Sequence, residues 1–259
     1  NTFTKGMLIL KIYSLKFKVY LLKDIKAENA VESIRNLIDQ SMLNNKKMYD
    51  LHYKNQFKMY SHGSLTPIEP DYIYKAGKIY QFLIRTTDER IKDLGQKIII
   101  NEMNDDMKVL TVSTTLLPTN NPISKLKSVT PVVVKFFQTE GSIEEGNLKF
   151  IHESYWRNNR SIDEFEEKLK HNLINKYKYL HNIDNLDENF EFIRRLSFKN
   201  TNYPITTKYK NITLLSDLIE IEIAENKMSQ ELANIAIATG IGEMGSRGYG
   251  FTTYKLEER

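Results

Sequence analysis

A glycine-rich segment near the C-terminus decides how this sequence is interpreted. Residues 240–251, here called the glycine loop, read Gly-Ile-Gly-Glu-Met-Gly-Ser-Arg-Gly-Tyr-Gly-Phe. Glycine permits positive φ angles and close backbone approach, successive free N–H groups form a concave anion site, and an arginine fork suits phosphate. We therefore expect phosphate-binding residues at Gly240, Gly242, Gly245, Ser246, Arg247 and Gly248. A tight helix-to-strand connection, with glycines for geometry alone, is the alternative.

The glycines also form a G-x-G-x-x-G pattern at positions 240, 242 and 245, but the context is not that of a dinucleotide-binding fold. That fingerprint follows a strand and opens a helix. Here a helical pattern over 228–239 comes first, and a predicted strand over 249–256 follows. A Walker A loop is excluded because no Gly-Lys-Ser/Thr follows the glycines.

Composition narrows the class of protein. The 259 residues are 41% hydrophobic and 27% charged, and the net charge of +4 is compatible with a nucleic-acid partner. The sequence has no cysteine, which excludes disulfides, thiolate nucleophiles and Cys-based zinc sites and favours a reducing cytoplasm. No apolar run reaches the length of a membrane span, and no His-x-x-x-His or carboxylate cluster indicates a metal. We expect neither membrane, metal nor cofactor.

The hydrophobic pattern predicts a similar order of helices and strands in each half of the chain. For the first half we expect helices at 27–43 and 88–100, and strands at 7–22, 56–62, 71–74, 78–86 and 108–117, with a hairpin through Ala76-Gly77. A linker is predicted at 118–131 from its prolines. For the second half we expect helices at 161–180, opened by a Ser161/Glu164 capping box, and 228–239. Its strands are predicted at 129–138, 148–151, 191–199, 211–224 and 249–256.

Each half thus follows the strand–helix–strand–strand–helix–strand order of the split β-α-β-β-α-β unit. The predicted fold class is α+β: tandem duplicated ferredoxin-like (RRM-like) domains with antiparallel sheets. We place the first domain at residues 1–121, with a candidate catalytic loop, and the second at 122–259, with the glycine loop.

A duplicated chain of this kind, with the glycine loop just before its last strand, resembles the RAMP superfamily, and within it the CRISPR repeat-processing endoribonucleases. The second matching segment is Leu51-His52-Tyr53-Lys54-Asn55-Gln56-Phe57-Lys58-Met59-Tyr60-Ser61. In that family a loop after the first helix often carries a histidine. A lysine commonly follows six positions later and opens a strand of the form Lys-x-aromatic-Ser/Thr. Residues 77–84 resemble the following strand.

The resemblance implies that His52 and Lys58 are catalytic. Some members carry a third catalytic residue, a tyrosine in the first helix; residues 27–43 contain none, and Tyr49 is the nearest substitute. His62 stands where the family usually has an apolar or aromatic residue and is a second candidate. A histidine suits acid–base work because its pKa lies near neutrality, and a lysine stabilises developing phosphorane charge.

The implied reaction is metal-independent cleavage of CRISPR precursor RNA within its repeats. The 2′-hydroxyl attacks the adjacent phosphate and leaves a 2′,3′-cyclic phosphate and a 5′-hydroxyl. Further RNA contacts are expected from an aromatic and arginines, which suit base stacking and phosphate binding: Trp156, Arg157, Arg160, Arg194 and Arg195. Each of these could instead belong to an ordinary solvated surface.

Two other functions remain open from the sequence. A RAMP protein can bind RNA without cutting it, as a subunit of a CRISPR effector complex, and members without an active-site histidine exist. A small-molecule enzyme could hold a nucleotide in the glycine loop. The expected partners are CRISPR repeat RNA and effector-complex subunits, with the protein a monomer or homodimer.

Overall fold

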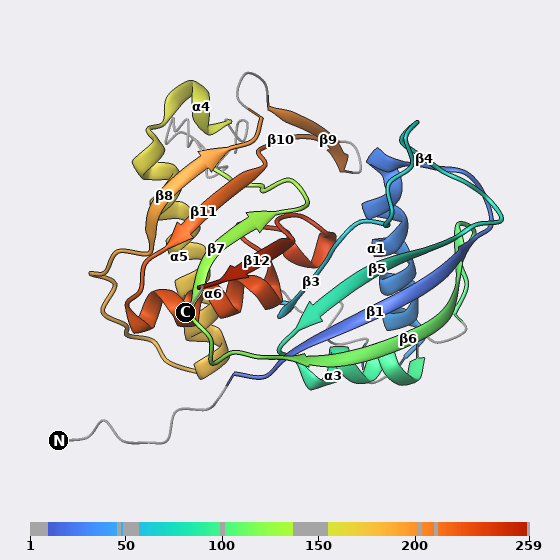
Figure 1. Cartoon of the computed structure of the whole chain (residues 1–259), viewed down its shortest axis with the longest axis horizontal. Helices are drawn as coiled ribbons and strands as arrows, with labels where there is room; N and C mark the ends of the chain where they lie inside the picture. The colour runs from blue at the N-terminus through green and yellow to red at the C-terminus, as the bar shows by residue number, and fades with distance from the viewer. Residues whose placement is uncertain are drawn as a thin grey trace, which may run out of the picture.

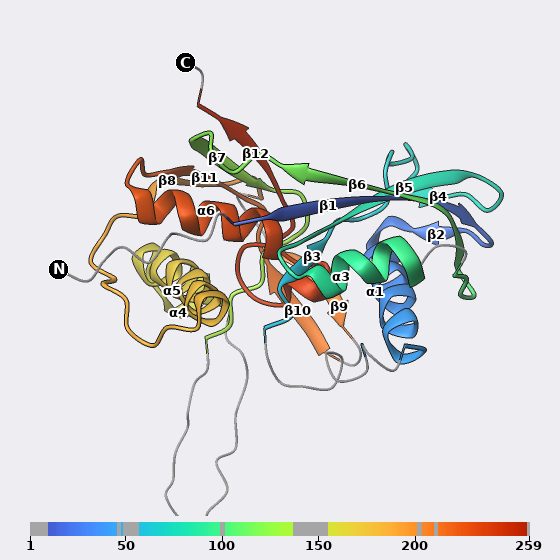
Figure 2. The ribbon, with the colours of Figure 1, turned by 90° about the horizontal axis from the view of Figure 1, so that it is seen from below.

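Two four-stranded antiparallel sheets form the framework of the protein. The structure is a computed structural model, and it describes residues 10–45, 48, 57–98, 102–136, 155–200, 204–209 and 212–257. The sheets lie next to each other (Figure 1). Seen at right angles, the longer helices of both halves lie on the same side of the sheets (Figure 2).

The first sheet has the strand order β3-β5-β1-β6. Its strands are β1 (Ile12–Leu21), β3 (Tyr60–His62), β5 (Ile79–Thr86) and β6 (Met107–Leu117). Helix α1 (Ala27–Leu43) connects β1 to β3. Between β5 and β6 comes α3 (Glu89–Asp93), continued by the π-helical turn η1 (Leu94–Ile98). With every pairing antiparallel, this is the ferredoxin-like arrangement.

The second sheet repeats that arrangement in the order β12-β7-β11-β8. Its strands are β7 (Ile123–Ser128), β8 (Ile193–Phe198), β11 (Ile219–Ile223) and β12 (Thr252–Leu256). The short α4 (Trp156–Asn159) precedes α5 (Ile162–His181), and α6 (Lys227–Thr239) precedes the glycine loop. Ser161 and Glu164 form the expected capping box. The tandem ferredoxin-like fold is thereby confirmed, while the division at residue 121 stays a prediction.

Two short ribbons lie outside these sheets. They are β2 (Ile25–Lys26) with β4 (Ile73–Tyr74), and β9 (Ile205–Tyr209) with β10 (Ile212–Ser216). The predicted hairpin of 71–74 with 78–86 is wrong, because β4 pairs with β2 whereas β5 pairs with β1 and β3. The N–H of Gly77 donates to the carbonyl of Leu21, so the turn folds onto the end of β1 instead.

Two further expectations for the second half need correction. The predicted linker at 118–131 contains β7, a central strand of the second sheet. The strand predicted at 129–138 is absent from its described part, 129–136, where Val132 and Val133 make only isolated bridges. Residues 148–151 lie outside the described residues. The prolines therefore mark the ends of a strand rather than a linker.

The cores explain why these elements pack as they do. Alternate residues Leu15, Phe17 and Val19 of β1 are buried, and α1 buries a stripe of apolar residues at helical spacing. A second cluster gathers between α5, α6 and the second sheet. Helix α6 also touches the first sheet, where Ser61 Oγ donates to the carbonyl of Ala238 at 3.1 Å. This contact fixes the end of α6, and hence the glycine loop, at the junction of the two halves.

Among the described helices, none is both long enough and apolar enough to cross a lipid bilayer.

Candidate functional site

The glycine loop is folded tightly onto itself. Helix α6 ends at Thr239 and is capped by Gly240, and the N–H of Ile241 donates to the carbonyl of Gly250 at 2.9 Å. Gly250 has a φ of +65°, and a Cβ there would lie 1.9 Å from the carbonyl oxygen of Ile241. The chain therefore requires this glycine for its own geometry, as the tight-connection interpretation expected. Anion binding by the loop stays a prediction.

A buried lysine holds the start of the loop. Lys176 of α5 donates from Nζ to the carbonyls of Gly240 at 2.9 Å and Gly242 at 3.1 Å. Burial lowers the pKa of Lys176 to about 7, and Glu243 acts in the opposite direction. A neutral amine keeps two N–H groups, which match the two carbonyls. Sequence reasoning missed Lys176 because it looks like every other lysine of a charged helix.

The far side of the loop packs against the first half. The 3-10 turn η2 (Gly245–Arg247) lies against β3 and α1. At Gly248, with a φ of +87°, a Cβ would lie 2.3 Å from Cγ1 of Val31 and 2.5 Å from Cε1 of His62. Only a residue without a side chain allows this approach. The loop is thus the point at which the second half meets α1 and β3.

Three cations gather at this junction, here called the cation cluster: Arg35, Lys58 and Arg247. Lys58 is half-buried, and burial together with the charge of Arg247 lowers its pKa, while Asp39 opposes the shift. Asp39 also pairs with Arg35 Nε at 3.8 Å. Arg35 also pairs with Glu32 Oε1 at 3.1 Å, so the three cations lie beside the carboxylates of Asp39 and Glu32. A phosphate there would relieve the repulsion between Lys58 and Arg247.

His62 is sealed inside the protein next to this cluster. Its exposed fraction is 0%, and Nδ1 lies 3.0 Å from the carbonyl of Gly63, which assigns the proton to Nδ1. Nε2 has no hydrogen-bond partner within the described part of the chain. Burial lowers the pKa of His62 to about 4, with Arg35 adding to the effect. A neutral, inaccessible imidazole is poorly placed to exchange a proton with a substrate.

The other two catalytic candidates, His52 and Tyr49, lie outside the described residues. Of the catalytic candidates that the structure describes, Lys58 and His62 both lie next to the glycine loop, and of these two only Lys58 is partly exposed. A site for metal is not found either: no group of three His, Asp or Glu side chains is placed to hold an ion in the residues that the structure describes.

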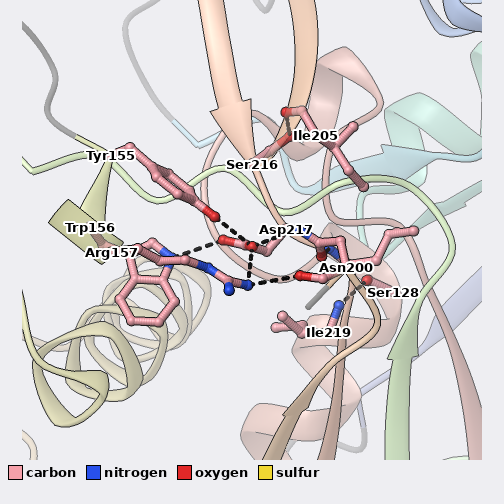
Figure 3. Close-up of polar contacts among 10 residues, drawn as sticks. Ser128, Tyr155, Trp156, Arg157, Asn200, Ile205, Ser216, Asp217 and Ile219 are labelled. Atoms are coloured by element: carbon pink, nitrogen blue, oxygen red, sulfur yellow. Dashed lines mark hydrogen bonds and ion pairs between the residues drawn. The ribbon is translucent and has the colours of Figure 1, made fainter. Parts of the chain in front are cut away.

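Trp156 and Arg157 belong to a buried network around Asp217 (Figure 3). Asp217 Oδ2 accepts from Trp156 Nε1 at 2.8 Å, and Oδ1 accepts from Arg157 Nη2 at 2.7 Å. The same Oδ1 accepts from Tyr155 and Asn200. Trp156 is only 8% exposed, and its ring packs against Phe165 and Phe198. Base stacking on RNA does not fit this buried position, where the ring packs in an aromatic cluster and Nε1 binds Asp217.

The remaining predicted arginines lie away from the glycine loop. Arg160 pairs with Glu164 at 3.1 Å, as helix neighbours. Arg194 pairs with Glu225 at 2.8 Å. Arg195 follows it on β8, the edge strand on the far side of the second sheet from the first (Figure 1). Their role in RNA binding stays a prediction for a second surface rather than for the cation cluster.

A cavity of about 610 Å³ opens beside the cation cluster. It lies between α1, the segment after β3, the glycine loop and β9, and its lining includes both Arg35 and Arg247. Sequence reasoning missed it because its walls come from parts of the chain that are far apart in the sequence.

Comparison with known proteins agrees with this architecture. The family model for the C-terminal part of CRISPR associated protein Cas6 matches residues 117–254, which is more than half of the chain. The chain belongs to the Cas6 family, and the resemblance to RAMP-type, CRISPR-associated repeat-RNA-processing proteins is thereby confirmed. No curated protein matches it significantly.

Solved structures share the whole fold at low sequence identity. A RAMP protein described as binding different RNA substrates has a TM-score of 0.70 and 15% identity over 94% of this chain and 99% of its own. A CRISPR associated protein Cas6 has a TM-score of 0.64 and 18% identity, over 94% and 99%. A Cas6-related protein from Pyrococcus furiosus has a TM-score of 0.63 and 15% identity, over 95% and 100%.

Proposed function

We propose that this protein is a metal-independent endoribonuclease of the cytoplasm that cleaves CRISPR precursor RNA within its repeats. The observation that carries the proposal is the seating of the glycine loop on β3 and α1. It brings Arg247 of the second half to Lys58 and Arg35 of the first. A scissile phosphate between them would be held by cations from both halves.

In this proposal Lys58 and Arg247 stabilise the charge on the pentacoordinate phosphorus, an electrostatic role that is strongest in a partly buried site. His52 moves a proton, either from the attacking 2′-hydroxyl or to the departing 5′-oxygen. The bond between phosphorus and the 5′-oxygen breaks as the 2′-oxygen–phosphorus bond forms. The products are a 2′,3′-cyclic phosphate and a 5′-hydroxyl.

The test is incubation of end-labelled cognate repeat RNA with the protein in EDTA. We expect one cut, which a single 2′-deoxy substitution immediately upstream of it abolishes. His52→Ala and Lys58→Ala should each slow cleavage by about 100-fold or more. Lys227→Ala removes the same charge from an exposed site at the opposite end of α6 and should cut at the wild-type rate. Cleavage that needs added Mg²⁺, or that survives the 2′-deoxy substitution, contradicts the proposal.

A second candidate is a RAMP protein that binds RNA without cutting it, within a CRISPR effector complex. Two observations favour it: α1 contains no tyrosine, and His62 is inaccessible. Salt-dependent binding of the repeat RNA without any product, for wild type and variants alike, would establish this function in place of cleavage.

A further inference from the structure

The cavity beside the cation cluster is lined by apolar residues, which a site for phosphate alone would not need. Its inner walls are largely apolar and include Val31, Leu65, Pro131 and Tyr249. The hydroxyl-bearing residues Ser64, Thr66, Thr130 and Thr206 also line it. Apolar walls with a few polar groups characterise sites for organic ligands, and its volume of about 610 Å³ lies in their usual range.

The cavity and the cation cluster are continuous. Arg35 and Arg247 line the cavity and belong to the cluster, and Gly248 lies at the boundary between the two. A nucleotide whose phosphate lies at the cluster therefore has its base within reach of the apolar walls. Proteins that recognise single-stranded RNA bury unstacked bases between aromatic or apolar side chains and contact their edges through polar groups.

The wall formed by β9 is held in place by a hydrogen bond to its partner strand β10, and the chain before β9 by hydrogen bonds to the turn before β11. Ser216 Oγ donates to the carbonyl of Ile205 at 2.9 Å (Figure 3). Asn200, which follows β8, binds the turn between β10 and β11. Its Nδ2 donates to Asp217, and its Oδ1 accepts from the N–H of Leu218 at 2.7 Å. The root of the hairpin is thus tied to the buried Asp217 network. A preformed wall reduces the ordering cost of binding.

We propose that this cavity binds one unpaired nucleobase of the RNA substrate, from a nucleotide that flanks the phosphate held by the cation cluster. The inference rests on the proposed function for the location of the phosphate, but not on cleavage. It makes the cavity a specificity-determining subsite, since the hydroxyls that line it contact the edge of the bound base.

The test is a double-mutant cycle on RNA binding. The RNA carries a 2′-deoxy group at the cut, where a cut is made, so that it stays intact, and an abasic residue at each unpaired position of the repeat in turn. Val129 lines the cavity and is 47% exposed, so Val129→Trp fills the cavity without disturbing a core. Leu116→Trp, at a 56% exposed site on β6 outside the cavity, is the matched control. Thr206→Trp fills the cavity from β9 and replaces Val129→Trp should that variant unfold.

We expect an abasic residue at one of these positions to weaken binding to the wild type by about 10- to 100-fold. Val129→Trp should lower the affinity for intact RNA by a similar factor, and the abasic residue should lower the affinity of this variant little further. Leu116→Trp should bind both RNAs as the wild type does. Independent losses, or no effect of any abasic residue, overturn the inference. The inference is also overturned if Val129→Trp abolishes the binding of a free mononucleotide but leaves the affinity for RNA unchanged.

The cycle separates the two proposals. Coupling between the abasic residue and Val129→Trp in a protein that never cuts RNA supports the base pocket and refutes cleavage. Cleavage without coupling supports the nuclease and refutes the base pocket.

Discussion

The two ferredoxin-like units share one strand order but differ in how their loops are held. In the second unit, buried ionisable groups anchor the loops: Lys176 binds carbonyls of the glycine loop, and Asp217 fixes the root of the β9–β10 hairpin. In the first unit, the turn at Gly77 closes with backbone hydrogen bonds near the surface. Its buried guanidinium, Arg85, donates instead to Thr252 of the second unit. The repeated topology is a scaffold, and the unrepeated buried charges shape the site.

The largest difference should come from adding one methyl group to a glycine in each unit. At Gly250 the new Cβ would overlap the carbonyl of Ile241, whereas at Gly77 the nearest atom is 3.8 Å away. Both have positive φ, so Gly77→Ala should cost about 1 kcal/mol of unfolding free energy from backbone strain alone. Gly250→Ala should cost about 3 kcal/mol or more, measured by urea denaturation. Equal losses would show that the glycine loop adapts easily, against the view of a rigid loop.

Asp217→Asn should be nearly as damaging, because it removes a charge that receives four donors in a site only 1% exposed. Breaking a buried ion pair from one side costs about 3–5 kcal/mol. Asp71→Asn is the control in the first unit: Asp71 is exposed and pairs with Lys75, and such pairs contribute about 0–1 kcal/mol. Thermal denaturation of both variants measures the contrast. Similar melting temperatures would mean that the Asp217 network does not anchor the second unit.

Lys176 should make the stability of the protein depend on pH. The folded chain releases the Lys176 proton above a pKa of about 7, whereas the unfolded chain keeps it to about 10.5. The unfolded state binds more protons between these values, so the free energy of unfolding rises with pH. Between pH 7 and 9 the wild type should gain about 2–3 kcal/mol over Lys176→Met. Lys168→Met, at an exposed site on the same helix, should follow the wild type. Parallel curves for wild type and Lys176→Met would contradict this.

The smallest effect concerns the faces of the two sheets that point away from the helices. On β1, Lys16 and Lys18 are exposed and have no ion-pair partner within the described chain. On the second sheet, Lys125 and Lys199 pair with Glu220 and neighbouring acids. Unpaired cations attract the RNA backbone more strongly. Lys16→Ala/Lys18→Ala should therefore weaken RNA binding by a few fold more than Lys125→Ala/Lys199→Ala in a salt titration. The reverse order would assign the RNA to the second sheet.

Much of the scaffold could be predicted from the sequence because it depends on local pattern. Helix α1 spans residues 27–43 as its apolar stripe indicated, and the Ser161/Glu164 box marks the start of α5. Strand β7 was missed because Ser124, Lys125 and Lys127 occupy its less buried positions and prolines flank it. In a central strand with one open face, only Ile123, Leu126 and Ser128 need to be buried.

Less of the candidate site could be predicted from the sequence. The glycine loop and Lys58 could be singled out, since their residue types and spacing are unusual. Lys176, Asp217 and the partly buried Arg35 could not be, because the sequence does not show whether an ionisable residue is buried or solvated, and only tertiary packing distinguishes the two. Trp156 and the adjacent arginine were assigned to RNA for the same reason: nothing local indicated Asp217, sixty residues away, as their partner.

The central claim is that Lys58 of the first unit and Arg247 of the second hold the same phosphate. The most direct test is the salt dependence of binding to uncleavable repeat RNA by Lys58→Ala, Arg247→Ala and the double variant. Each phosphate contact contributes about 0.7–0.9 to the slope of log affinity against log salt. If one phosphate is shared, the double variant should lose about one such contribution, and its loss of affinity should be smaller than the product of the single losses. Two full contributions, with multiplicative losses of affinity, would show that the two cations bind separate phosphates and would contradict a single site built from both units.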